Sequence, residues 1–178
     1  MKMLLALVAA LAATAPHAHA VEAVRACQPP PAQAFTFEEV ATGDYESLYV
    51  PGGILIPHSA GRVFSVEDTL DPGACPVEGR HLAVRVTDSK RKVISFHKTT
   101  GRAGTVSFDY AMSGDVHAAV IPITDGLVGG SITLEGPSGH FEYVSPPGKE
   151  TPNLGIYYRS DTGDGILRVD NVSMRDDT

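Results

Sequence analysis

The stretch TVSFDY, residues 105–110, alternates polar and apolar side chains without interruption. Valine, phenylalanine and tyrosine take every second position, and threonine, serine and aspartate stand between them. A period of two places the apolar side chains on one face of a β-strand. The stretch therefore predicts a strand with one buried face and one polar face.

The same period recurs along the chain, and segments rich in Gly, Pro, Asp and Ser separate the apolar runs. No window after the first twenty residues keeps a helical period of 3.6. The pattern predicts an all-β domain of about nine strands in two packed antiparallel sheets. Residues 41–80 alternate weakly, and we expect long loops there with one or two irregular strands. The apolar runs are 32–40, 82–86, 93–96, 106–110, 116–121, 132–134, 141–143, 154–158 and 166–174.

The start of the chain has the layout of a secretory signal peptide. A positive start precedes an apolar run over residues 4–13, and Ala18 and Ala20 put small residues at −3 and −1 of a cleavage point. A membrane anchor is the alternative, but the run is too short to cross about 30 Å of hydrocarbon. We expect a signal peptide over residues 1–20, a Pro-rich lead-in over 21–34 and a β-sandwich domain over 35–176, in a secreted or periplasmic protein.

The chain of 178 residues is acidic, with 14 Lys and Arg against 21 Asp and Glu and a net charge of −7. Loss of the signal peptide removes Lys2 and takes the net charge to −8. This balance disfavours nucleic acid and anionic membrane surfaces as partners, because both bind through clustered Lys and Arg. No later apolar run approaches the ~20 residues of a membrane span, and the length suits one domain with its own core.

Two cysteines, Cys27 and Cys75, lie after the cleavage point in Pro-flanked segments. In an oxidising compartment an even pair predicts one disulfide. Closing a loop of this length stabilises the fold by roughly 4 kcal/mol in the chain-entropy model. Two free thiols and a zinc site are weaker alternatives, because neither cysteine has an adjacent cation and no Cys-x-x-Cys spacing occurs.

The end of the chain breaks the period of two. Leu167 and Val169 are separated by two positions and fall on one face. Val172 and Met174 are also separated by two positions but fall on the other face. One extra residue at Asp170-Asn171 would return all four apolar side chains to one face, and such a β-bulge re-aims side chains. A strand buried on both faces near its end is the alternative. With a bulge, we expect Asp170 to be turned toward a ligand at the sheet edge.

Two segments carry a family resemblance: Phe35-Thr36-Phe37-Glu38-Glu39 near the start, and LRVDNVSM, residues 167–174, at the end. They resemble the two ends of jelly-roll domains in the galactose-binding-like superfamily, which includes many carbohydrate-binding modules and exported bacterial proteins. In those families the Phe-Glu and the Asp-Asn-Val meet at one edge and commonly hold a structural calcium ion. The resemblance implies a jelly-roll sandwich in which Glu38 and Asp170 are calcium ligands, joined by backbone carbonyls.

The physical chemistry of calcium agrees with this implication. Calcium is a hard ion that takes six to eight oxygens, which carboxylates and carbonyls supply. Two carboxylates from distant segments would join the first strand to the last, and without an ion they would repel each other. Glu39 takes the role if the register is shifted by one residue. The alternative is a solvated Glu38 on a strand, with Asp170 accepting hydrogen bonds from backbone amides at the bulge.

Four histidines lie on four of the predicted runs or at their ends. If these runs share a sheet, its open face would combine imidazoles with carboxylates and hydroxyls, which suits a sugar, a metal or acid–base chemistry. Scattered surface histidines are the alternative. The candidate ligand face comprises His81, His97, His117, His140 and Tyr157.

Sugar-binding platforms usually present flat aromatic rings, yet the sequence contains no tryptophan. Tyr45, Tyr49 and Tyr157 are the tyrosines outside the core pattern. A sugar-binding surface would therefore combine tyrosines with polar groups.

Three functions follow from these patterns. The first is an exported non-catalytic binding protein, with a glycan as candidate ligand and a structural calcium ion. The second is a structural or adhesive surface protein that binds a protein partner. The third is a small exported hydrolase or lyase that works from a polar sheet face, which requires at least two of the four histidines to converge with a carboxylate.

Overall fold

The computed structural model describes most of the predicted domain. The expected signal peptide, nearly all of the lead-in, Cys27 and Cys75 lie outside the described residues, so cleavage and the disulfide stay predictions. None of the helices in the described part of the chain has the length and hydrophobicity to cross a membrane. The described residues are 34–57, 64–69, 77, 79–87, 89–101, 103–124, 126–151 and 153–176.

These residues form one short 3-10 helix and thirteen β-strands. The alternating segment at 105–110 is the first half of the long strand β7. The elements are η1 (Phe37–Glu39), β1 (Gly43–Tyr45), β2 (Ser47–Val50), β3 (Ile54–Pro57), β4 (Phe64–Thr69), β5 (Gly79–Val86), β6 (Lys92–Lys98), β7 (Thr105–Gly114), β8 (His117–Thr124), β9 (Leu127–Val128), β10 (Ile132–Thr133), β11 (Ser138–Val144), β12 (Asn153–Arg159) and β13 (Gly165–Arg175).

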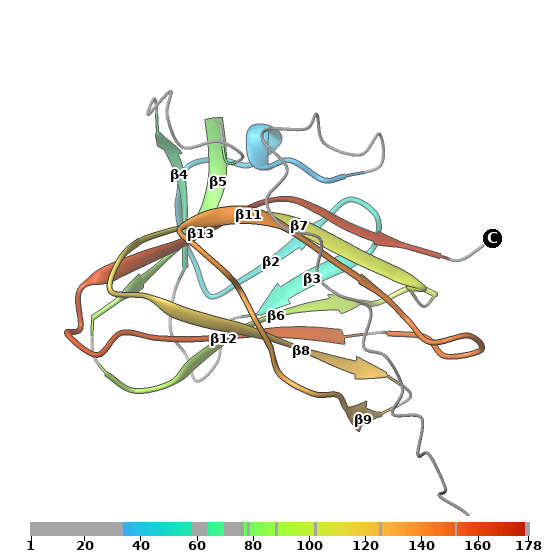
Figure 1. Cartoon of the computed structure of the whole chain (residues 1–178). Coiled ribbons are helices and arrows are strands. Elements are labelled where there is room, and N and C mark those ends of the chain that lie inside the picture. The colour runs from blue at the N-terminus through green and yellow to red at the C-terminus, as the bar shows by residue number, and fades with distance from the viewer. Residues whose placement is uncertain are drawn as a thin grey trace, which may run out of the picture.

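The strands pair into two antiparallel sheets that face each other (Figure 1). The six-stranded sheet has the order β1-β4-β5-β13-β7-β11, and the seven-stranded sheet has the order β10-β8-β12-β6-β3-β2, with β9 beside β8. The predicted all-β jelly-roll sandwich is therefore confirmed. The expected number of strands was too low, because the region 41–80 contributes β1 to β4 and the start of β5.

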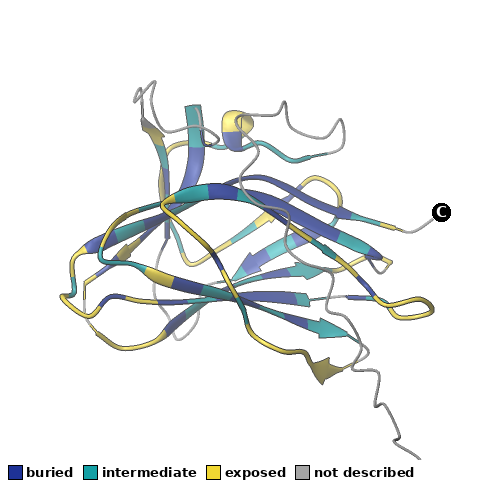
Figure 2. Cartoon of the chain, viewed as in Figure 1, coloured by how far each residue is buried: buried dark blue, intermediate teal, exposed yellow. Residues whose placement is uncertain are grey.

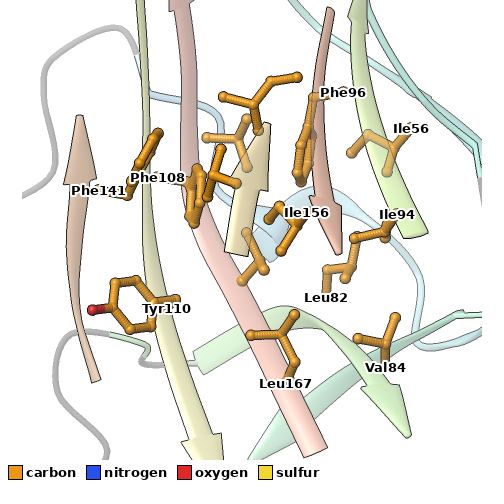
Figure 3. Close-up of a cluster of buried hydrophobic side chains, with 14 of the residues drawn as sticks. Ile56, Leu82, Val84, Ile94, Phe96, Phe108, Tyr110, Phe141, Ile156 and Leu167 are labelled. Carbon is orange, nitrogen blue, oxygen red and sulfur yellow. The ribbon is translucent and has the colours of Figure 1, made fainter. Parts of the chain in front are cut away.

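The core fills the space between the sheets, where the apolar positions of the alternating segments meet (Figure 3). Phe108 of β7 stacks on Phe96 of β6, in the opposite sheet, with 6.2 Å between ring centroids. Phe141, on the neighbouring strand β11, stacks on the same ring at 4.9 Å. Burial follows the strand centres, and exposure concentrates at strand ends and loops (Figure 2). Phe108 thus links both sheets at the centre of the apolar layer.

The predicted β-bulge is present in β13. Its register against β7 shifts between Asp170 and Ser173. Asn171 lies in the left-handed region with a φ of 52°, the one non-glycine among the described residues with positive φ. Val169 and Val172 consequently both reach the core. Asp170 and Ser173 are buried on the opposite face, so the strand is also buried on both faces near its end.

The opening and closing segments lie side by side, as expected. Phe35 and Val172 form an antiparallel bridge, in which the amide of Phe35 donates to Val172 O at 2.7 Å and the amide of Val172 donates to Phe35 O at 2.9 Å. Two details differ from the expectation. The segment after Phe35 turns into η1 instead of continuing as a strand. Moreover, β13 is a central strand, so Asp170 does not lie at a sheet edge.

The positive φ of Asn171 gives a test of the bulge. Asn171→Val should destabilise the fold by about 1–2 kcal/mol more than Asn171→Gly, because a β-branched residue is strained in the left-handed region. Both variants lose the asparagine side chain, so the difference isolates the backbone. Chemical denaturation measures both values, and equal losses would contradict the bulge geometry.

Candidate functional site

The outer face of the six-stranded sheet carries a line of titratable side chains across five strands. Asp170 of β13 lies opposite Asp109 of β7, which lies opposite His140 of β11. On the other side of β13, Glu67 of β4 lies opposite His81 of β5. The register of β13 against β5 makes His81 and Asp170 the next residues after the last pair, Leu82 and Val169. We call Glu67, His81, Asp170, Asp109 and His140 the polar row.

Asp109 is held at both of its carboxylate oxygens. Its Oδ1 lies 2.6 Å from Nδ1 of His140, and its Oδ2 accepts a hydrogen bond of 2.7 Å from Nδ2 of Asn171. The bulge residue therefore fixes Asp109, and Asp109 orients an imidazole whose side chain is 34% exposed. Sequence reasoning named His140 and Asp170 but missed Asn171 as a partner of Asp109, because that contact depends on the backbone conformation at the bulge.

Asp170 is buried with 3% exposure and has no cationic partner among the described residues. Its Oδ1 accepts a hydrogen bond of 2.7 Å from the amide of Asn171, which is the contact named above as the alternative to a calcium ligand. A backbone hydrogen bond with Phe37 adds to it. Burial, helped by the carboxylates of Asp109 and Glu38, raises the pKa of Asp170 to about 7 against the lowering effect of these two hydrogen bonds.

Glu38 lies on η1, which sits over β5 (Figure 1). Its Oε1 accepts a hydrogen bond of 3.0 Å from the amide of Arg80. The Arg80 guanidinium donates in return to the carbonyl oxygens of Glu38 and Val40, at 2.8 and 3.2 Å. A Cβ on Gly79 would lie 2.1 Å from Oε1 of Glu38, so this contact requires the glycine. The first segment thus brings Glu38 within electrostatic reach of Asp170, although Glu38 and Glu39 are both exposed.

His81 is buried in the polar row and is neutral. Its Nδ1 lies 2.9 Å from the carbonyl oxygen of Gly79, which can only accept, so Nδ1 carries the proton. Burial lowers the pKa of His81, and the nearby Arg168 lowers it further. Its Nε2 is buried without a hydrogen-bond partner, as are the hydroxyls of Ser107 and Ser173 on the same face. The face around the bulge therefore holds buried polar atoms that the described residues leave unsatisfied.

The four histidines are divided between the two sheets. His81 and His140 belong to the six-stranded sheet, and His97 and His117 belong to the seven-stranded sheet. His140 contacts Asp109, whereas His117 contacts Asp115 and Asp161. The four predicted runs therefore do not share one sheet, and of the four histidines only His81 and His140 lie in the polar row, together with its carboxylates.

His117 lies where two loops meet, at one end of the seven-stranded sheet. Its Nε2 is 3.2 Å from Asp115 and 3.5 Å from Asp161. The three ligand atoms lie within 4.8 Å of one another. Asp115 also accepts hydrogen bonds from the amides of Asp161 and Thr162, at 3.0 and 3.1 Å. An exposed ion pair between the β7–β8 and β12–β13 loops accounts for this cluster, which the sequence pattern did not predict.

The outer face of the seven-stranded sheet has a different chemistry. Tyr157 lies between Val93 and Ala119 on the flanking strands, and the buried Gly155 lies between Ser95 and Ile121. Gly155 has no side chain, and the Tyr157 ring lies against it: a Cβ on Gly155 would be 3.3 Å from Cε2 of that ring. We call the outward-facing residues Tyr49, Leu55, Val93, Ser95, His97, Ala119, Ile121, Ile123, Thr133, Asn153, Gly155 and Tyr157 the platform.

Tyrosines lie at two places on the platform. Tyr157 is half-buried, and the guanidinium carbon of Arg91 lies 4.1 Å from its ring centroid. Tyr49 of β2 is 62% exposed, and its hydroxyl lies 3.1 Å from that of Thr99. Tyr45 lies elsewhere, because it stacks on Phe64 in the six-stranded sheet at 6.0 Å. The platform combines aromatic, aliphatic and uncharged polar groups.

The outer faces of the two sheets differ in their content of carboxylates. The polar row contains Glu67, Asp109 and Asp170. By contrast, no Asp or Glu occupies an outward-facing position in the described strands of the seven-stranded sheet. The negative charge of the protein is therefore unequally shared between its two sheet faces.

No protein-family model matches the chain, and no curated protein is similar to it at a significant level. Several solved structures of carbohydrate-binding modules share its fold class at low sequence identity. A family 29 module from Piromyces equi has a TM-score of 0.42 and 9% identity, over 74% of this chain and 76% of that one. A family 61 module in complex with β-1,4-galactotriose has a TM-score of 0.47 and 11% identity, over 72% of this chain and 90% of that one. A family 29 module in complex with mannohexaose has a TM-score of 0.43 and 11% identity, over 75% of this chain and 91% of that one.

The raised pKa of Asp170 predicts a specific pH dependence in the presence of a chelator. The folded state keeps the Asp170 proton up to about pH 7, whereas the unfolded state loses it near the ordinary value of 3.8. The contribution of this group to stability is therefore full below about pH 4 and is lost as the pH rises through about 7. Relative to the wild type, Asp170→Asn should gain up to about 4 kcal/mol of stability between pH 4 and pH 8.

Chemical denaturation of both proteins across this range measures the effect. The comparison with the variant is needed because the neutral His81 acts in the opposite direction, destabilising the fold as the pH falls below its ordinary value. A stability difference between variant and wild type that does not change with pH would contradict the buried, unpaired state of Asp170.

Proposed function

We propose that this protein is an exported carbohydrate-binding β-sandwich that holds a glycan on the platform. The observation that carries the proposal is the composition of this face: an open sheet surface with tyrosines, aliphatic side chains and uncharged hydrogen-bonding groups, and without a carboxylate at its outward-facing positions. The predicted signal peptide and disulfide supply the support for export.

The chemistry of a sugar matches such a surface. A pyranose ring has apolar faces made of CH groups and a rim of hydroxyls, so it binds where flat apolar area adjoins donors and acceptors. Tyr157, whose ring lies against Gly155, offers the first, and His97, Asn153 and Ser95 offer the second. The side chains stand on paired strands, which fix their spacing and reduce the entropy lost on binding.

A protein partner is the second candidate, and a different feature favours it. Leu127 and Val128 of β9 are 72% and 70% exposed, and Val128 pairs with Ile123 at the border of the platform. Exposed apolar side chains next to a flat sheet face are typical of protein interfaces. Leu127→Ser should weaken a protein partner's binding and leave glycan binding unchanged.

Tyr157→Ala gives the direct test of the glycan proposal. Loss of the ring should weaken glycan binding by about tenfold or more, since aromatic contacts contribute about 1 kcal/mol or more beyond their buried area. Calorimetry or a glycan array measures it, with β-1,4-galactotriose and mannohexaose, the ligands of two similar modules, among the first probes.

Val144→Ala is the matched control, because Val144 is an exposed apolar residue on β11 of the other sheet. It should bind glycans like the wild type. If the wild type binds no glycan on a broad array, the proposed function is refuted.

A structural calcium ion at Glu38 and Asp170 is the second part of the proposal. Asp170 supports a cation here because it is a buried carboxylate without a cationic partner among the described residues, and Glu38 and Asp109 both act on it electrostatically. The three carboxylates are not gathered at ligand spacing in the described residues, so the remaining ligands would be backbone carbonyls. A hard divalent ion would offset this repulsion with oxygen ligands. The bridge between Phe35 and Val172 lies beside these residues, so an ion there would strengthen the contact between the ends of the domain.

Chelation tests the calcium site. Calcium should raise the melting temperature by several degrees over chelator, because an ion that binds only the folded state stabilises it. Asp170→Asn should abolish this difference. Asp161→Asn, which removes a carboxylate from the His117 cluster, should leave it unchanged. Superimposable melting curves of the wild type with and without calcium would rule out a calcium site. If the effect of calcium on the melting temperature were lost in Asp161→Asn but kept in Asp170→Asn, the calcium site would instead be the His117 cluster.

A further inference from the structure

We infer that the glycan bound on the platform is acidic, and that Arg91 recognises its carboxylate or sulfate groups. The inference rests on the proposed function and adds to it the chemical class of the ligand. It starts from the charge distribution over the two sheets and from the position of one arginine.

A run of basic residues lies at one end of the seven-stranded sheet. The chain carries a net charge of −7, yet the turn between β5 and β6 leads into Lys90-Arg91-Lys92, the longest run of basic residues in the chain, in which Lys92 is buried and Arg91 is exposed. Lys92 begins β6 and pairs with Tyr158 on β12. The run therefore lies beside the Tyr157 end of the platform, on the sheet whose outward-facing strand positions lack carboxylates in the described residues.

Arg91 differs from Arg159, the arginine on the described strands of this sheet. Arg159 pairs with Asp161. Arg91 is exposed and contacts the Tyr157 ring at 4.1 Å, with no ion pair to a carboxylate among the described residues. A guanidinium above an aromatic ring is held by the ring's electrons while its N–H groups stay available to an anion.

The position of Arg91 favours an acidic sugar beside Tyr157. The guanidinium lies over one face of the ring, 4.1 Å from its centroid. An acidic sugar bound next to this ring gains the attraction of the cation, whereas a neutral sugar does not. Arginine binds carboxylate and sulfate oxygens through two parallel hydrogen bonds, which a neutral hydroxyl cannot match.

Three ligands distinguish the possibilities: oligogalacturonate, which carries carboxylates, dextran sulfate, which carries sulfates, and neutral β-1,4-galactotriose. The wild type should bind at least one of the two acidic ligands more tightly than the neutral one, by about tenfold or more at low salt. This preference should shrink as salt rises, because the attraction is electrostatic. The relative affinity for the two acidic ligands assigns the anionic group.

Arg91→Ala should remove the preference for the acidic ligand, and Arg91→Lys should restore only part of it, because lysine lacks the planar fork. Arg85→Ala is the matched control: Arg85 is an exposed arginine of the six-stranded sheet that pairs with Glu67. It should bind like the wild type. Circular dichroism checks that each variant is folded.

Two outcomes would overturn the inference and leave the proposed function intact. One is a wild type that binds the neutral ligand as tightly as both acidic ones. The other is an Arg91→Ala variant that binds the neutral ligand more tightly than the wild type does, which would make Arg91 a cover over Tyr157. Failure of the wild type to bind any of the three ligands or a broader glycan panel would instead count against the proposed function itself.

Discussion

The single-residue bulge at Asn171 is the constraint on which the arrangement of this molecule depends. It lets Val169 and Val172 both enter the core while Asp170 lies on the outer side of a central strand. The same residue donates to Asp109 and so ties β13 to β7 outside the backbone ladder. Val172 then meets Phe35, so the extra residue also sets where the first described segment of the domain attaches.

The outer faces of the two sheets consequently differ in their side-chain chemistry. Buried carboxylates and a neutral imidazole gather around the bulge, where their mutual repulsion and their burial are costly without a cation. The opposite sheet has neither bulge nor carboxylate at its outward-facing described strand positions, and there the Tyr157 ring lies against Gly155. We therefore propose a stabilising role for the first face and a binding role for the second.

The sequence predicted features that depend on local periodicity. Alternation at 105–110 predicted β7, and the broken parity after Val169 predicted the bulge, because side-chain direction follows position along a strand. One or two irregular strands were expected where β1 to β4 lie, since segments of three to six residues give little periodic signal. The polar row and the division of the histidines depend on strand order and register, which connect residues distant in the chain. Arg91 has no periodic signature, and its contact with Tyr157 appears only when β6 and β12 are paired.

We propose that the seven-stranded sheet, and not the bulged sheet, recognises a glycan. The most direct measurement is nuclear magnetic resonance of the isotope-labelled protein, titrated with an oligosaccharide that it has been found to bind. We expect the largest changes in amide chemical shift in β6, β8 and β12, and no change in β5 and β13. Changes confined to β13 and its neighbours in the six-stranded sheet would place the ligand on the opposite face and contradict the proposal.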